Sequence, residues 1–163
     1  MELDYQTIFE QLNKEKIDYL VVGGLAVNFH GIPRMTYDID LMIHLDPKNI
    51  HKLVSTFVNW GYRPRVPVNP EDLANEKKRN SWIQEKNMKA FTFYNENQPI
   101  GEVDLVMESP IPYGELKARA ITIRLEGQEI PVVSIRDLIE LKLEAGRKQD
   151  ISDVENLRTI LEK

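Results

Sequence analysis

The segment from Tyr19 to Leu45 constrains the fold of this chain more than any other part of the sequence. It opens with a short apolar run, YLVV, which suits a buried strand. The pair Gly23-Gly24 follows and permits a tight turn into a short helix, predicted from Leu25 to Phe29. A second strand is predicted from Ile39 to His44. This alternation predicts a domain that mixes strands with helices.

Two aspartates, Asp38 and Asp40, occupy alternate positions at the start of the second strand. Side chains two residues apart on a strand point to the same face, so the two carboxylates lie together. Like charges in close contact are destabilising unless something compensates them. A divalent cation is one compensation, and Mg²⁺ and Mn²⁺ prefer such oxygen ligands. The alternative is a solvent-exposed strand end that carries two aspartates and binds no metal.

A third carboxylate, Asp104, lies inside another strand-like run, IGEVDLVM. An acidic residue in an apolar strand is costly unless it is paired or bound to a metal. We therefore expect Asp104 to lie beside Asp38 and Asp40 and to complete a metal site of three carboxylates. The alternative is an edge-strand aspartate that forms a salt bridge with Lys89 or Arg124.

The residues around the glycine pair indicate a phosphate-binding turn. Gly23 and Gly24 allow close approach of the backbone, and exposed N–H groups at a helix start favour phosphate. Arg34 suits phosphate recognition by its planar fork, and Thr36 adds a hydroxyl donor. The dinucleotide fingerprint GxGxxG and the lysine of a P-loop are both absent. Arg34 as a counter-ion for the strand aspartates remains an alternative.

The rest of the chain predicts one α/β domain of 163 residues, with a mixed sheet and helices mainly on one side. We expect residues 1–133 to form the core with its strands, and residues 134–163 to form a C-terminal helical segment. Helices are predicted at Tyr5–Lys14, at Ile50–Trp60 with Asp46 as N-cap and Pro47 at its first position, after the N-cap Ser134, and at Ile151–Leu161. Further strands are predicted at Ala90–Tyr94 and Glu102–Val106, and a hairpin at Ile121–Leu125 and Gln128–Val132. A long loop is predicted at Gly61–Asn80.

Composition excludes several classes of protein. Cysteine is absent, so neither a disulfide framework nor a thiolate zinc site is expected. The sequence predicts neither a signal peptide nor a membrane span, and we expect a cytoplasmic protein. A net charge of −5 argues against strong nonspecific nucleic-acid binding. A local basic cluster near Trp82 still offers RNA contact as an alternative to a solvated loop; it comprises Arg63, Arg65, Lys77, Lys78 and Arg79.

Taken together, these motifs resemble a known family. Gly-Gly-Leu-Ala from Gly23, His30-Gly31, and the run R-x-T-x-D-I-D-L from Arg34 to Leu41 resemble the nucleotidyltransferase fold of the DNA polymerase β superfamily. Within it, the chain is similar to small proteins of the AbiEii type, which include components of bacterial toxin–antitoxin systems. A C-terminal pattern resembles the family motif K…R-x-K-D-x-x-D imperfectly, because Gln149 stands between Lys148 and Asp150; it consists of Lys142, Arg147, Lys148, Asp150 and Asp153.

The resemblance implies a role for each motif. Gly23 and Gly24 match the turn that holds a nucleoside triphosphate. The strand aspartates match the two metal-binding carboxylates, with Asp104 as the third. Lys142 is implied to reach the phosphates, with support from Asp153. The turn departs from the many family members that have Gly-Ser, because Leu25 follows Gly24 and brings no hydroxyl.

These implications lead to two hypotheses. The first is a metal-dependent nucleotidyltransferase that uses Mg²⁺ or Mn²⁺ and moves a nucleoside monophosphate from a nucleoside triphosphate to a hydroxyl of a protein, RNA or small molecule. The second is a non-catalytic protein of the same fold that binds a cognate toxin or antitoxin. Hydrolysis of phosphoesters by the same carboxylates is a third, weaker alternative. The sequence identifies neither the nucleotide nor the acceptor.

Overall fold

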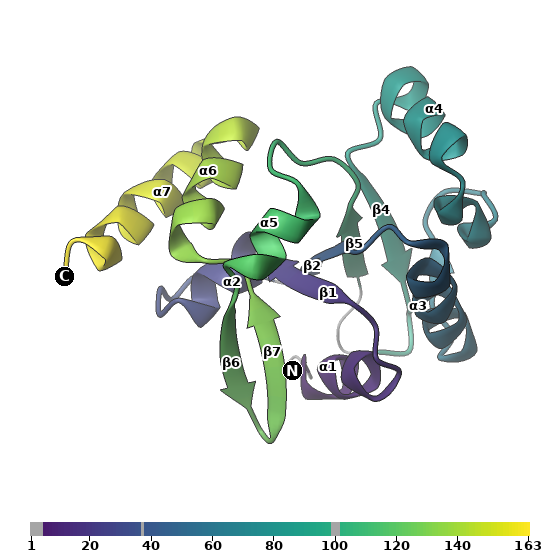
Figure 1. The fold of residues 1–163 in the computed structure, drawn as a ribbon, viewed down its shortest axis with the longest axis horizontal. Helices are drawn as coiled ribbons and strands as arrows, with labels where there is room; N and C mark the ends of the chain where they lie inside the picture. The colour runs from purple at the N-terminus through teal and green to yellow at the C-terminus, as the bar shows by residue number, and fades with distance from the viewer. Residues whose placement is uncertain (1–4, 37, 99–101) are drawn as a thin grey trace.

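The computed structural model describes residues 5–36, 38–98 and 102–163. These residues contain a mixed sheet of seven strands in the order β3-β4-β5-β2-β1-β7-β6, surrounded by helices (Figure 1). The mixed α/β architecture that the sequence predicts is therefore confirmed. Its strands are β1 (Tyr19–Val22), β2 (Asp38–Ile43), β3 (Arg63–Pro64), β4 (Ala90–Tyr94), β5 (Glu102–Val106), β6 (Ile121–Leu125) and β7 (Gln128–Val132).

Strands β2 and β5 lie at the middle of the sheet and run parallel, although each has an antiparallel neighbour on its other side. The odd-numbered side chains of β2, such as Ile39 and Leu41, are fully buried, and Val103 of β5 is buried with them. Because strand side chains alternate between faces, the aspartates of both strands lie on the opposite face. One face of the central sheet thus belongs to the core, and the other carries carboxylates.

The first half of the chain follows the sequence prediction closely. Helix α1 (Tyr5–Lys14) and strand β1 have the predicted bounds, whereas α2 (Gly23–Phe29) begins two residues earlier than predicted. Helix α3 (Pro47–Asn59) begins where Asp46 accepts hydrogen bonds from the backbone N–H groups of Lys48 and Asn49, as expected for an N-cap followed by proline. The predicted N-cap Asp46 and the predicted first helical residue Pro47 are therefore confirmed, although the range predicted for this helix began only at Ile50.

The predicted long loop at Gly61–Asn80 is wrong. This stretch contains β3, the 3₁₀ helix η1 (Pro70–Ala74) and the start of α4 (Glu76–Lys86). Asparagine side chains begin both helices, because Asn69 accepts from the N–H of Glu71 and Asn75 from that of Lys78. Helix α4 has one buried residue, Trp82, so it lacks the apolar spacing that reveals a helix in sequence. Helix α5 (Tyr113–Ala118) was also missed.

The chain ends in two helices, α6 (Ile135–Ala145) and α7 (Lys148–Leu161), which pack side by side (Figure 1). Ser134 accepts a hydrogen bond from the N–H of Asp137, as predicted for the N-cap of α6. Gly146 ends α6 with a φ of 65°, a conformation that glycine adopts without strain. The second helix starts at Lys148, three residues before the predicted Ile151.

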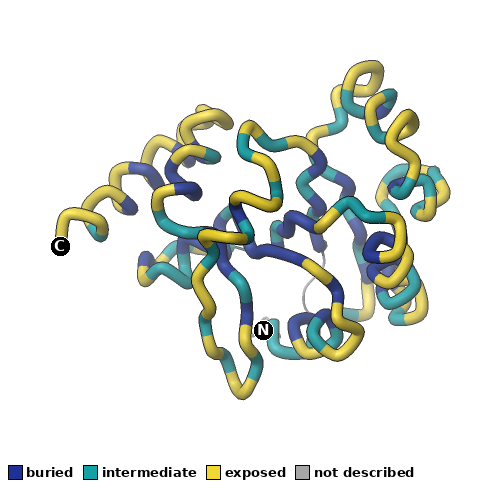
Figure 2. The backbone as a smooth tube through the Cα atoms, viewed as in Figure 1, coloured by how far each residue is buried: buried dark blue, intermediate teal, exposed yellow. Residues whose placement is uncertain are grey.

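Buried and exposed residues occupy different parts of the molecule (Figure 2). The central strands and the inner sides of α1 and α3 form one continuous apolar core, whereas α4 and the tip of the β6–β7 hairpin are largely exposed. Within the ranges that the structure describes, no helix combines the length and the apolar character that a membrane crossing requires.

Candidate active site

A cavity of about 890 Å³ lies over the carboxylate face of β2 and β5. The end of β1, the start of α2 and the segment Arg34–Thr36 line it on one side, and α6 with the start of α7 lines it on another. All eight site residues proposed from the sequence line this one cavity: Gly23, Gly24, Arg34, Thr36, Asp38, Asp40, Asp104 and Lys142. The fold therefore gathers side chains that are as much as 119 positions apart in the chain.

The glycine turn packs directly against Asp40. Gly23 has a φ of 67°, and a Cβ atom at this position would lie 2.1 Å from Oδ2 of Asp40 and 2.8 Å from its Cβ and Cγ. Asp40 in turn is the register partner of Val22, the last residue of β1. Glycine at position 23 is thus required both by the left-handed backbone and by the close approach of the carboxylate.

The three predicted carboxylates occupy neighbouring positions on the two strands. Asp40 and Asp104 are register partners across β2 and β5, and Asp38 lies two residues before Asp40 on the same face. Thr92 of β4 donates a hydrogen bond of 2.5 Å to Oδ1 of Asp104, which holds that carboxylate in place. Strand β5 lies between β2 and β4, so Asp104 is not an edge-strand residue. The alternative partner Arg124 instead pairs with Glu129.

Burial and neighbouring carboxylates raise the pKa of Asp40 and of Asp38. Burial, followed by the charges of Asp104 and Asp38, raises the pKa of Asp40 to about 6, while Lys142 opposes the shift. Burial and the charges of Asp104 and Glu102 also raise the pKa of Asp38, and Arg65 opposes this. Such a set of mutually repelling oxygen ligands is stabilised by a cation. Its chemistry therefore fits Mg²⁺ or Mn²⁺.

The arrangement is not yet that of a closed metal centre. Among the residues that the structure describes, no three Asp, Glu, His or Cys side chains converge as a ready metal-binding group. Carboxylate side chains rotate about two bonds, and Asp38, Asp40 and Asp104 share one face of adjacent strands. The three side chains thus share one wall of the cavity.

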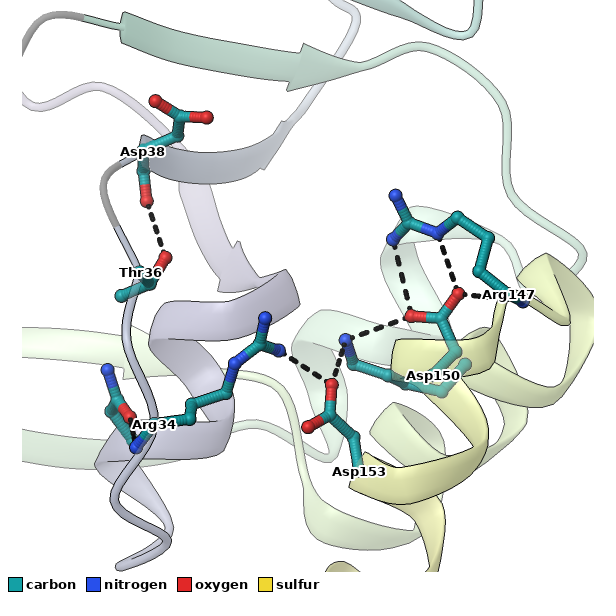
Figure 3. A network of polar contacts seen from close by, with 8 residues as sticks. Arg34, Thr36, Asp38, Arg147, Asp150 and Asp153 are labelled. Atoms are coloured by element: carbon teal, nitrogen blue, oxygen red, sulfur yellow. Dashed lines mark hydrogen bonds and ion pairs between the residues drawn. The ribbon is translucent and has the colours of Figure 1, made fainter.

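Arg34 and Thr36 cover the second glycine of the turn. A Cβ atom on Gly24 would lie 3.0 Å from Oγ1 of Thr36 and 3.3 Å from Cζ and Nη1 of Arg34. Thr36 also donates a hydrogen bond of 3.3 Å to the backbone carbonyl of Asp38 (Figure 3). The Nε atom of Arg34 is buried without a hydrogen-bond partner. An unsatisfied buried donor is costly, so this atom suits a ligand that brings an acceptor.

Arg34 forms its ion pair with a residue of α7. The alternative interpretation had made it the counter-ion of the strand aspartates. Nη1 of Arg34 lies 2.6 Å from Oδ2 of Asp153, and Nζ of Lys142 lies 2.9 Å from the same oxygen (Figure 3). Asp153 therefore supports Lys142, as the resemblance implied. Lys142 is 5% exposed, so the alternative of a solvated salt bridge on the helix pair is wrong.

Two further residues of the cavity wall, Arg147 and Asp150, were missed as site residues. Asp150 is 1% exposed and lies 3.2 Å from Nζ of Lys142 and 2.7 Å from Nε of Arg147. The signal in the sequence was the D-x-x-D spacing with Asp153, which places both aspartates on one face of a helix.

The basic cluster does not form a stacking platform around Trp82. The indole is 5% exposed and lies against the Phe91 ring in the core. Arg79 donates to the carbonyl of Leu73, and Lys78 pairs with Asp72. The buried indole therefore offers no stacking surface for a base, and RNA contact by the basic residues stays an untested alternative to a solvated segment.

Comparisons with known proteins point to one fold. The family model described as "Nucleotidyl transferase AbiEii toxin, Type IV TA system" matches residues 8–156. Among solved structures, the lincosamide antibiotic adenylyltransferase LnuA bound to lincomycin superposes with a TM-score of 0.64 and 16% identity, over 98% of this chain and 99% of that one. No curated protein sequence matches the chain.

Two further solved structures agree. A putative nucleotidyltransferase from Thermotoga maritima has a TM-score of 0.59 and 18% identity, over 96% of this chain and 89% of that one. The structure of ANT(2″)-Ia in complex with adenylyl-2″-tobramycin has a TM-score of 0.58 and 13% identity, over 94% and 85%. At such low identity these structures establish a shared fold.

Proposed function

Because the chain belongs to the AbiEii nucleotidyltransferase family, we propose that it transfers a nucleoside monophosphate from a nucleoside triphosphate to a hydroxyl group. Asp38, Asp40 and Asp104 would hold Mg²⁺ or Mn²⁺. The observation that carries this proposal is the contact of Gly23 with Asp40, since it joins a phosphate-binding turn to the carboxylate face. Register pairing of Asp40 with Asp104 adds the third carboxylate to the same place.

The triphosphate would lie between the glycine turn and the C-terminal helices. Gly23 and Gly24 begin α2, so their backbone N–H groups have no partner in the preceding turn of a helix. Arg34 brings a buried Nε donor that lacks an acceptor, and Thr36 brings a hydroxyl beside Gly24. Lys142 faces the same cavity from α6. These groups supply positive charge and donors opposite the carboxylates, which suits a polyphosphate.

The protein's own groups would then guide the displacement. A divalent cation held by Asp38, Asp40 and Asp104 would supply Lewis-acid stabilisation of the reacting phosphate. Asp104 would accept the proton of the acceptor hydroxyl, with Thr92 holding its carboxylate through Oδ1. The hydroxyl oxygen forms a bond to the α-phosphorus, the bond to the β-phosphate oxygen breaks, and pyrophosphate leaves.

The test follows the α- and γ-phosphates separately. Purified protein is incubated with Mg²⁺ or Mn²⁺, cell extract and each of the four nucleoside triphosphates, labelled at either the α- or the γ-phosphate. Transfer predicts that the α-label joins a protein, RNA or small molecule while the γ-label leaves with pyrophosphate. Hydrolysis would release both labels without an adduct, and absence of transfer with all four nucleotides would refute the proposal.

A pair of variants assigns the carboxylates. Asp40→Asn removes a charge from the cavity and should lower transfer at least about hundredfold. Glu129→Gln is the matched control, because its carboxylate pairs with Arg124 on the exposed β6–β7 hairpin and should leave transfer unchanged. Equal activity of Asp40→Asn and wild type would show that the carboxylate assignment is wrong.

We also propose a cognate partner, because the matching family model is described as a toxin of a type IV toxin–antitoxin system. A cognate antitoxin would be the product of a neighbouring gene. The alternative of a non-catalytic binding protein predicts a phenotype in the native host that is equal for wild type and for Asp38→Ala/Asp40→Ala. The catalytic proposal predicts that the double variant abolishes the phenotype.

A further inference from the structure

Two buried aspartates on α7 hold three cations against the wall of the cavity. Asp150 and Asp153 are 1% and 3% exposed and lie one helical turn apart. Asp153 pairs with Arg34 and Lys142, and Asp150 pairs with Lys142 and Arg147 (Figure 3). Lys142 thus bridges both carboxylates, and the five groups together carry one excess positive charge.

Arg147 is the exposed member of this network, and part of its guanidinium makes no contact with Asp150. Its Nε and Nη2 atoms donate to the two oxygens of Asp150 at 2.7 and 3.2 Å. A guanidinium group bound in this way keeps Nη1, and one hydrogen of Nη2, directed away from the carboxylate. Figure 3 shows the remaining terminal nitrogen pointing away from Asp150. The side chain is 75% exposed and lines the cavity.

Stability alone does not account for this arginine. Asp150 already receives Lys142 and the backbone N–H of Arg147, at 3.2 and 3.1 Å. Against the effect of burial, the hydrogen bond from Arg147 also lowers the pKa of Asp150, yet it occupies only Nε and Nη2 of the guanidinium. The charge of Arg147 nevertheless reaches across the cavity, because Asp40 is among the groups that raise its pKa, after the hydrogen bond and charge of Asp150. A fixed guanidinium fork on a cavity wall is suited to phosphate.

We propose that Arg147 binds the phosphates beyond the α-phosphate of the nucleotide, and that Asp150 is a positioning residue that holds Arg147 and Lys142 in the cavity. The inference rests on the proposed nucleotidyl transfer. The α-phosphate must lie at the carboxylates of β2 and β5, where the acceptor attacks. Arg147 lines the same cavity from the start of α7 and not from the strands that carry the carboxylates, so we assign its donors to the part of the substrate that leaves as pyrophosphate.

Calorimetry with magnesium pyrophosphate and with the four nucleoside monophosphates tests the role of Arg147. Arg147→Gln should weaken pyrophosphate binding about tenfold to hundredfold and leave monophosphate binding unchanged, because one charge-assisted contact is lost. Arg147→Lys should recover part of the affinity, since it keeps the charge without the fork. Arg124→Gln is the matched control, because this exposed arginine pairs with Glu129 on the distal hairpin.

The outcomes separate the inference from the proposed function. If wild type binds neither pyrophosphate nor any nucleotide, the proposed function itself fails. If wild type binds pyrophosphate and Arg147→Gln binds it equally well, only the inference is overturned. An equal loss for pyrophosphate and for monophosphate would place Arg147 elsewhere on the substrate and would also overturn it.

A double-variant cycle tests the positioning role of Asp150. With Asp150→Asn, the additional change Arg147→Gln should weaken pyrophosphate binding less than about threefold, because the guanidinium is no longer held. The same factor in both backgrounds would show that Asp150 does not position Arg147. In turnover assays Asp150→Asn should raise KM for the nucleotide, whereas a purely structural loss would lower kcat at constant KM. Urea unfolding checks the fold, and Asp150→Glu replaces a variant that fails to fold.

Discussion

Replacing Gly23 by alanine tests the contact on which the proposed site depends. The backbone at this position has a φ of 67°, which costs an L-residue about 1–2 kcal/mol. The new methyl group would also lie 2.1 Å from Oδ2 of Asp40 and 2.8 Å from its Cβ and Cγ. Non-bonded atoms do not tolerate these distances, so either α2 or β2 must shift. Overpacking of this kind costs about 1–3 kcal/mol.

The glycine at position 127 separates the two contributions. Gly127 has a φ of 84°, and a Cβ atom there would meet nothing within 4 Å. Gly127→Ala therefore carries the backbone cost alone, and both variants gain the same small amount, about 0.4–1 kcal/mol, from the restricted unfolded chain. The difference between the two variants isolates the overlap with Asp40. We expect Gly23→Ala to be less stable than Gly127→Ala by about 1–3 kcal/mol.

Urea unfolding followed by tryptophan fluorescence measures this difference, provided that both variants unfold in one transition with equal m-values. A third variant, Gly23→Ala/Asp40→Ala, removes Oδ2 and Cγ from the overlap and leaves only Cβ at 2.8 Å. Its loss of stability should be smaller than the sum of the single losses by about 1 kcal/mol. The proposed overlap with Asp40 is wrong if Gly23→Ala is as stable as Gly127→Ala. It is also wrong if the losses of unfolding free energy are additive in the double variant.

Three further predictions concern other contacts. Thr92→Val removes the hydrogen bond to Asp104 and should lower kcat for transfer about tenfold while thermal stability changes little, because the carboxylate loses its orienting partner. Ser134→Ala should lower the free energy of unfolding by about 1 kcal/mol in urea, since the N-cap of α6 is lost. Burial raises the pKa of Asp18, but hydrogen bonds and the charge of Lys117 outweigh it and lower the pKa below 3.8. The stability that Asp18 contributes over Asp18→Asn should therefore be present above about pH 4 and shrink as the pH falls further; a difference that grows on acidification would contradict it.

Local interactions made much of the fold predictable. The bounds of α1 and β1 follow from apolar spacing, and the caps Asp46 and Ser134 use contacts within three residues of themselves. Prediction failed where a helix lacks an apolar face. Helix α4 buries only Trp82, and the prolines before it made the whole stretch look like a loop.

Local sequence patterns do not predict the ion pairs in the cavity wall. Arg34 had two equally plausible anionic partners nearby in sequence, yet it pairs with Asp153, 119 positions away. The choice depends on where α7 docks against α6, which no local pattern specifies. The same docking buries Lys142 and Asp150. A charge run that reads as a solvated surface can therefore become a buried network once two helices meet.

Local sequence patterns specify the separate parts of the site: a glycine turn, two aspartates on one face of a strand, a third in another strand, and the resemblance of these motifs to one fold. Tertiary structure decided what each part faces. The parallel register of β2 with β5 places Asp104 beside Asp40, and the path from β1 to β2 brings Gly23 onto the same carboxylate. The physical reason is that alternation sets the face of a side chain, whereas sheet order and register, fixed by packing of the whole core, select its neighbours.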